Sequence, residues 1–125
     1  MATLYSMTMI KGDFKEISVI RQDESSNHIS LSGHVVRFAV RNFEDGELLL
    51  GLSSSDPLEI YVPEIHSANP NEDDVGRAFV RITPDQSSTF PVASLLYDLE
   101  IQQAGTIYKS TILKGRINVI EEIVR

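Results

Sequence analysis

Apolar and polar residues alternate in the C-terminal third of the chain. From Leu95 to Ile101 every second residue is apolar, and most residues between them are polar. Successive side chains of a β-strand point to opposite faces, so this pattern predicts a half-buried strand. A second apolar-rich run follows at 111–119, and Gly105 between the two runs can supply the positive φ of a tight turn. The segment 95–119 therefore predicts a β-hairpin.

A similar two-residue period recurs through the rest of the chain. The clearest case is 34–41, where Val36, Phe38 and Val40 share one face and are predicted to be buried. The pair Asp45-Gly46 is a strong hairpin-turn signal after this strand. Further strands are predicted at 7–10, 14–21, 48–52, 58–62 and 77–82. No segment requires a helix, and the longest polar stretch, 66–76, is predicted to be an exposed loop.

This succession of short strands and turns predicts the fold class. Roughly seven to nine strands within one domain, residues 1–125, suit an immunoglobulin-like antiparallel β-sandwich of the all-β class. The cysteine pair and core tryptophan of antibody domains are both absent. A jelly roll or a small barrel is the structural alternative.

Composition restricts the function classes. The 18 acidic and 11 basic residues give a formal net charge of −7, which disfavours contact with phosphate backbones, so no nucleic-acid partner is predicted. No signal-peptide pattern and no run of about 18 apolar residues is present, so no membrane partner is predicted either. Without cysteine the chain has no disulfide, thiolate zinc ligand or cysteine nucleophile, which fits a protein assembled in a reducing cytoplasm.

No motif predicts catalysis or a cofactor. Serines cluster at 53–55 and 87–88, but no Gly-x-Ser-x-Gly elbow is present. No phosphate-binding loop or dinucleotide fingerprint is found. The sequence therefore predicts no catalytic residue, no cofactor and no enzyme activity.

Metal binding is not predicted either. The acidic segment 69–74 begins like a calcium loop, but an EF-hand needs glycine at its sixth position and glutamate at its twelfth, where Asp74 and Val80 stand. A solvated loop tip is the favoured interpretation. The three histidines, at positions 28, 34 and 66, share no metal-ligand spacing and are predicted to be ordinary surface or loop residues.

Charged residues on predicted strands form the one candidate interaction site. Arg37, Arg41 and Arg81 are predicted to line one face, with Asp98 and Glu100 facing them from a neighbouring strand. Cross-strand charge pairs stabilise a sheet by roughly 0.2–1 kcal/mol each. Contact with another subunit is one interpretation, and an ordinary polar sheet face is the other.

Two leucine runs are a second candidate feature. The segments 48–50 and 95–96 place apolar side chains on both faces of their strands. An exposed apolar patch often marks a subunit contact, whereas loops covering both sides would bury it. Both interpretations remain open from the sequence.

The order of these motifs resembles a known family. Leu31-Ser32-Gly33 leads into the strand 34–41, and the motifs 76–82, 96–101 and 111–119 follow. Over about residues 7–120 this succession resembles the immunoglobulin-like domains of bacteriophage tails, similar to the N-terminal domain of phage baseplate upper proteins.

The resemblance implies a non-enzymatic structural or accessory protein of a phage or prophage tail or baseplate. It implies location in the virion after assembly in the host cytoplasm. The implied partners are other virion or tail proteins, with a homo-oligomer as a further candidate. Baseplate upper proteins carry segments after this domain that the 125 residues do not contain, so a stand-alone virion protein or small tail accessory is expected. The alternative is a ligand-binding module that recognises a host-surface glycan or receptor through its loops.

Overall fold

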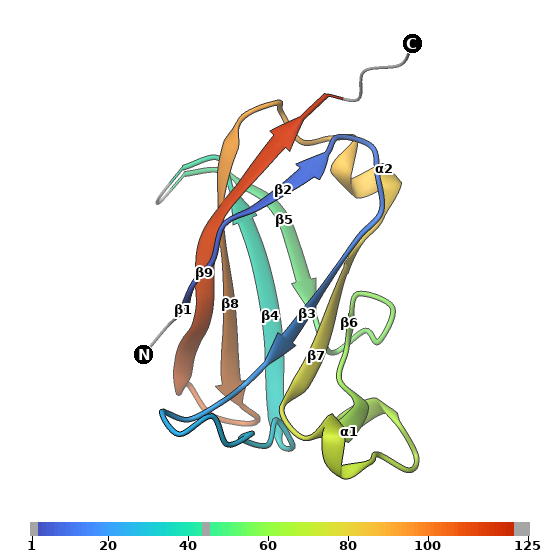
Figure 1. Ribbon diagram of the computed structural model, residues 1–125, viewed down its shortest axis with the longest axis vertical. Helices are drawn as coiled ribbons and strands as arrows, with labels where there is room; N and C mark the ends of the chain where they lie inside the picture. The colour runs from blue at the N-terminus through green and yellow to red at the C-terminus, as the bar shows by residue number, and fades with distance from the viewer. Residues whose placement is uncertain (1–2, 44–45, 122–125) are drawn as a thin grey trace.

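The structure is a computed structural model that describes residues 3–43 and 46–121, and it confirms the all-β sandwich (Figure 1). Two sheets pack face to face, with short helices at the two ends of the smaller one. The described strands are β1 (Thr3–Leu4), β2 (Met7–Ile10), β3 (Lys15–Ile20), β4 (His34–Arg41), β5 (Leu48–Ser53), β6 (Ile60–Tyr61), β7 (Arg77–Ile82), β8 (Ser94–Gln103) and β9 (Lys109–Ile120).

The strand order matches that of an immunoglobulin-like domain. The large sheet runs β1-β9-β8-β4-β5, with β2 also pairing with β9, and the small sheet runs β3-β7-β6. The orders β9-β8-β4-β5 and β3-β7-β6 correspond to strands G-F-C-C′ and B-E-D of that fold. Pairing is antiparallel except where β1 and β2 run parallel to β9. A parallel pair needs a long crossover, and here most of the domain lies between the two partners.

One continuous core lies between the sheets, and it confirms the predicted faces. Val36, Phe38 and Val40 of β4 are buried, and the Phe38 ring lies 5.6 Å from that of Tyr97 on β8. From the small sheet, alternate residues of β3 and β7 complete the same apolar cluster. The predicted alternation of β8 is also confirmed, with its core-facing side chains Leu95, Tyr97, Leu99 and Ile101 buried.

The predicted C-terminal hairpin is present. β8 and β9 pair antiparallel from Ser94 to Gln102, and the turn between them contains Gly105 at a φ of 76°. The other predicted hairpin joins β4 and β5, which also pair antiparallel. Glu44 and Asp45 of its turn lie outside the described residues. The sequence allows the C-terminal segment 119–125 to extend the last strand or to start a short helix; residues 119–120 continue β9, and residues 122–125 also lie outside the described residues.

Short helices replace parts of the predicted strands and loops. The predicted strand 58–62 is reduced to β6, because Pro63 begins the helix α1 (Pro63–His66) and proline is favoured in a first helical turn. The 3₁₀ turn η1 (Glu72–Asp74) lies in the predicted acidic loop. A second helix, α2 (Pro84–Ser87), follows β7 in a part of the chain where the sequence requires no helix, and Thr83 and Gln86 make a capping box there.

Candidate interaction site on the large sheet

The outer face of the large sheet carries charged side chains in register. Arg37 on β4 lies directly opposite Glu100 on β8, and Asp98 lies one row along, opposite Ala39 on β4 and Lys114 on β9. Arg41 shares the next row with Leu96 and Arg116. Side chains opposite one another in a sheet lie about 4.5–5.5 Å apart at Cβ, and diagonal neighbours about 7–8 Å. Four of the five predicted interface residues, Arg37, Arg41, Asp98 and Glu100, therefore share one face.

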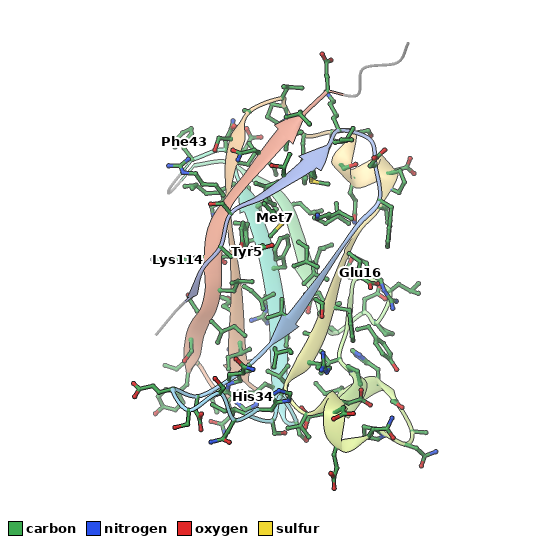
Figure 2. All side chains as sticks on the ribbon, in the orientation of Figure 1. Tyr5, Met7, Glu16, His34, Phe43 and Lys114 are labelled. Atoms are coloured by element: carbon green, nitrogen blue, oxygen red, sulfur yellow. The ribbon has the colours of Figure 1, made fainter. Side chains whose placement is uncertain are left out.

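We call this surface the cationic face, because it carries five cations and two carboxylates. Its charged residues are Arg37, Arg41, Lys109, Lys114, Arg116, Asp98 and Glu100. Five minus two gives a local charge of +3, although the whole chain has a formal charge of −7. In Figure 2 Lys114 lies at the β9 side of the molecule, opposite Glu16 of the small sheet.

An open cleft of about 630 Å³ lies on the β9 side of the cationic face. It is lined by cations, a carboxylate, hydroxyl-bearing side chains and apolar groups: Tyr5, Ser6, Arg41, Leu96, Tyr97, Asp98, Thr111, Lys114, Gly115 and Arg116. The segment between β1 and β2 forms one wall as it passes β9, and the Tyr5 side chain is 56% exposed there. The cleft therefore offers ionic contacts, hydrogen bonds and a ring surface to the same bound group.

Asp98 lies half-buried in this cleft. Burial, together with the nearby charge of Glu100, raises the pKa of the Asp98 carboxyl above its usual value, and Arg41 offsets part of that effect. Within residues 3–43 and 46–121 the Asp98 carboxylate makes no hydrogen bond and no ion pair, so it anchors no neighbouring loop or strand there. Folding thus leaves this carboxylate free to meet a partner.

Two of the cations in the cleft are also uncommitted. Within the described ranges, the side chains of Arg41 and Lys114 form no hydrogen bond or salt bridge. The other arginines make weak surface contacts: Arg37 donates to the side-chain oxygen of Gln102, and Arg116 Nη1 lies 3.5 Å from Ser94 Oγ. Exposed contacts of this kind contribute little to stability, so a partner can replace them at small cost.

The wall of the cleft is held by a buried tyrosine and a glycine. Tyr97 is buried, as predicted, and its hydroxyl donates a 2.5 Å hydrogen bond to the carbonyl oxygen of Tyr5. Burial, and secondarily Tyr5, raises the pKa of Tyr97 to about 12, so its hydroxyl stays a donor at neutral pH. A Cβ at Gly115 would overlap that same Tyr5 carbonyl oxygen. Gly115 therefore allows the N-terminal segment to lie directly against β9.

The structure separates Arg81 from the other predicted interface residues. Arg81 is on β7 of the small sheet, where its Nε lies 3.1 Å from Glu16 Oε2 on β3 and its guanidinium lies over the Tyr61 ring. The prediction that Arg81 lines the same face as Arg37 and Arg41 was wrong. Strand alternation places a side chain inward or outward, but it does not tell which of two sheets contains the strand.

The leucine runs are only partly exposed. Leu48 is 51% exposed at the start of β5, whereas Leu49 and Leu50 pack against the core. Leu95 is fully buried and Leu96 is half-buried on the cationic face. The runs therefore form no separate apolar patch, and Leu96 becomes an apolar centre among charged neighbours.

The remaining predicted candidates have structural roles. His66 accepts a hydrogen bond from Val62 N–H at Nδ1, so its Nε2–H donates to the carbonyl of Ser54, at 2.8 Å in each case. In the acidic loop, Asp74 accepts from the backbone N–H of Asn71 at 2.8 Å. Among the residues that the structure describes, no three histidine or acidic side chains lie close enough together to hold a metal ion.

Sequence reasoning missed the contribution of β9 to the site. Lys109, Lys114 and Arg116 supply three of the five cations on the cationic face. Strict alternation along the strand would place Lys109 and Lys114 on opposite faces, but an irregularity in register at Leu99 and Glu100 shifts the pairing of Lys114 and Arg116 by one residue and brings all three to the same face. A count of positions from the turn therefore places Lys109 correctly but puts Lys114 and Arg116 opposite the wrong partners.

The fold and this site define the chain as an all-β sandwich with a charged sheet face and an open cleft. A comparison with known protein families found no match, and a comparison with curated proteins found no matching sequence. Within the described part of the chain, no helix is long and apolar enough to span a bilayer.

Proposed function

We propose that the protein is a non-enzymatic structural or accessory component of a phage or prophage tail or baseplate that acts by protein–protein assembly. Its partners are other virion proteins, and it is located in the virion after assembly in the host cytoplasm. The observation that carries this proposal is the cationic face, which concentrates a charge of +3 on a chain of −7. Complementary charge steers association and selects partners.

The pattern of free and satisfied groups supports an assembly surface. The buried polar side chains of the described core all have hydrogen-bond partners, so the fold needs no further contact there. By contrast, Arg41, Lys114 and Asp98 are exposed or half-buried without partners in the described ranges. A partner surface that meets these three side chains gains charge-assisted hydrogen bonds without breaking existing ones.

Detection of the protein in purified virions tests this proposal. Particles from the genome that encodes the chain are purified through a density gradient, and their proteins are quantified by mass spectrometry. A fixed copy number per particle that survives high-salt washing is the expected result. Absence from intact particles, while the protein is abundant in the lysate, would overturn the proposal.

A second candidate function is recognition of an anionic host-surface glycan in the cleft. The specific observation is that the cleft combines Lys114 and Arg116 with Asp98, Thr111 and the exposed ring of Tyr5. The cations suit a carboxylate or phosphate, Asp98 suits sugar hydroxyls, and the ring provides a stacking surface. A ligand bound in this way would lie on the sheet and not on the loops that the sequence suggested.

Glycan arrays printed with acidic and neutral saccharides test this candidate. Binding restricted to acidic saccharides, and reduced by Lys114→Ala but not by Lys15→Ala on the small sheet, would support it. An array without signal for the wild-type protein would reject it.

A further inference from the structure

The charge of this molecule is distributed unevenly. The cationic face carries +3, so the remaining residues of the chain together carry −10. Residues 56–76, which include β6, α1 and η1, hold six acidic residues and no lysine or arginine. That part of the chain belongs to the layer opposite the large sheet, as Figure 1 shows. Each copy therefore carries the basic cationic face and an acidic surface formed by residues 56–76, while β7 of the small sheet itself adds Arg77 and Arg81.

We propose that the cationic face binds the acidic surface of a second copy of this chain in a head-to-tail contact. This inference rests on the proposed assembly function and names one partner for it. The contact joins two different surfaces, because two cationic faces brought together would place +3 against +3. Like charges brought together in an interface repel one another, which disfavours the face-to-face dimer.

The row formed by Arg116, Leu96 and Arg41 is the centre of the proposed contact. Leu96 lies directly between the two arginines across three neighbouring strands. No carboxylate lies in this row, whereas Asp98 and Glu100 occupy the next two rows. An incoming carboxylate therefore meets the least repulsion at the arginine row, where two guanidinium groups can each bind it in a bidentate manner. The half-buried Leu96 adds apolar contact between them.

Head-to-tail binding has a consequence for assembly. Each copy uses its cationic face once and its acidic surface once. A bound pair therefore still exposes one free cationic face and one free acidic surface. Such heterologous contacts close into rings or continue as filaments, depending on the rotation between neighbours. A protein that binds copies of itself head to tail repeats one small interface many times within a symmetric particle.

Charge reversal in the arginine row tests the proposal. The double variant Arg41→Glu, Arg116→Glu removes both central cations, and the control Lys11→Glu, Lys15→Glu makes the same change in net charge near β2 and β3. Molar mass is measured by size-exclusion chromatography with light scattering, over a range of concentrations and at roughly 0.05 M and 0.5 M salt. Far-UV circular dichroism and melting temperature verify that both variants are folded.

We expect the wild type and the control to associate as concentration rises, and high salt to weaken that association. The row variant should associate at least about tenfold more weakly than the control, since it loses two charge contacts. A mixing experiment determines the geometry. The row variant keeps its acidic surface, so it should still bind the wild-type cationic face and limit the growth of wild-type assemblies.

Three results would overturn the proposal. The first is a wild type that stays monomeric at every concentration, and the second is a row variant that associates like the control. The third is a row variant that does not bind the wild type, which would mean that the acidic surface is not the partner of the cationic face. Tight binding of a DNA duplex by a monomeric wild type would assign the face to nucleic acid instead.

Virion proteomics separates failure of this inference from failure of the proposed function. A monomeric protein that is nevertheless present in particles would reject self-association and keep the assembly function, with another virion protein as the partner. A self-associating protein that is absent from particles would keep the head-to-tail contact and reject the virion role.

Discussion

Phe38 shows what a single core residue contributes to this fold. Its side chain is 1% exposed and packs against Tyr97 between the two sheets. We expect Phe38→Ala to lower the free energy of unfolding by roughly 3–5 kcal/mol, because it removes a large apolar side chain and leaves a cavity. Chemical denaturation measures the change.

The neighbouring residue on the same strand is the control for this substitution. Arg37 points to the opposite face and is exposed. Arg37→Ala should therefore change the free energy of unfolding by about 0.5 kcal/mol or less. Equal effects of the two substitutions would contradict the assignment of the two faces of β4.

Asp98 is a residue whose charged form the fold disfavours. Burial, followed by Glu100, raises its pKa in the folded state. A carboxyl with a raised pKa contributes most to stability below its unfolded pKa of about 3.9, and this contribution is lost as pH rises through the folded value. We therefore expect Asp98→Asn to have a higher melting temperature than the wild type at pH 7 and a similar one near pH 3.

Thermal unfolding across this pH range checks the prediction, and the exposed Asp73→Asn is the matched control. A lower melting temperature of Asp98→Asn at pH 7 would mean that the carboxylate is stabilised in the folded protein by a neighbour. Residues that reduce stability are often kept for binding. A higher melting temperature of Asp98→Asn at pH 7 would therefore also support the proposed site.

At the scale of elements, Gly115 determines how the N-terminal strands lie against β9. A Cβ there would overlap the carbonyl oxygen of Tyr5, which also accepts the Tyr97 hydroxyl. We expect Gly115→Ala to cost about 1–3 kcal/mol, because β9 or the N-terminal segment must shift. Hydrogen exchange should show faster exchange at Tyr5, whose amide bonds to the Lys114 carbonyl at 2.8 Å.

Gly51 on β5 is the control position for the Gly115→Ala substitution. A Cβ at this position would meet its nearest neighbour, a methyl carbon of Leu48, at an ordinary distance of 3.7 Å. Gly51→Ala should be neutral or slightly stabilising, because glycine within a strand costs conformational entropy. If Gly51→Ala lost as much stability as Gly115→Ala, the result would contradict the claim that the N-terminal segment lies directly against Gly115.

Glu64 on α1 joins three segments that are distant in the sequence. Its carboxylate accepts hydrogen bonds from the N–H groups of Leu31 and Gly76, at 2.9 and 2.7 Å, and from the hydroxyl of Ser30 at 2.6 Å. Burial alone would raise its pKa, but these three donors outweigh burial and hold the pKa below its usual value. The carboxylate therefore stabilises the folded state above the unfolded pKa, and that contribution is lost as pH falls.

We expect Glu64→Gln to destabilise the protein by about 1–3 kcal/mol at pH 7, since an amide NH₂ would face one or more of these donors. The difference from the wild type should shrink below about pH 4 as Glu64 itself becomes protonated. Denaturation at several pH values measures this, with the exposed Glu72→Gln as control. A difference that is independent of pH would contradict the role of charge at position 64.

At the scale of the whole molecule, the two sheets share one core. The buried cluster contains residues from both, including Ile17 and Val80 of the small sheet and Val36 and Leu99 of the large one. We expect a single cooperative unfolding transition, with coincident curves from far-UV circular dichroism and tyrosine fluorescence. Separate transitions would mean that the sheets unfold independently and that residues 1–125 do not act as one domain.

The strands that the sequence predicted best are those with a long two-residue period. The faces of β4 and β8 follow from their alternation, and the bounds 77–82 predicted for β7 match the structure. The predicted strand at 58–62 was mostly wrong, because Leu58 is 77% exposed and Pro63 begins a helix. Short segments carry too few alternating positions to distinguish a strand from a turn or a helical turn.

The candidate site was predicted in part. Arg37, Arg41, Asp98 and Glu100 were placed together correctly, because β4 and β8 are long strands that pair directly. Arg81 was placed wrongly, since its strand belongs to the other sheet. The cleft could not be predicted, because it depends on the N-terminal segment passing β9, a contact between the two ends of the chain.

The sequence by itself determined which side chains of each long strand face the core, because burial follows a local period of two residues. Only the tertiary structure decided which strands are neighbours, because pairing depends on contacts between residues far apart in the chain. Lys114 and Arg116 lie beside Asp98 and Leu96 only once β9 has paired with β8 in its shifted register. An acidic chain thus acquires a basic face, a property that its net charge of −7 does not reveal.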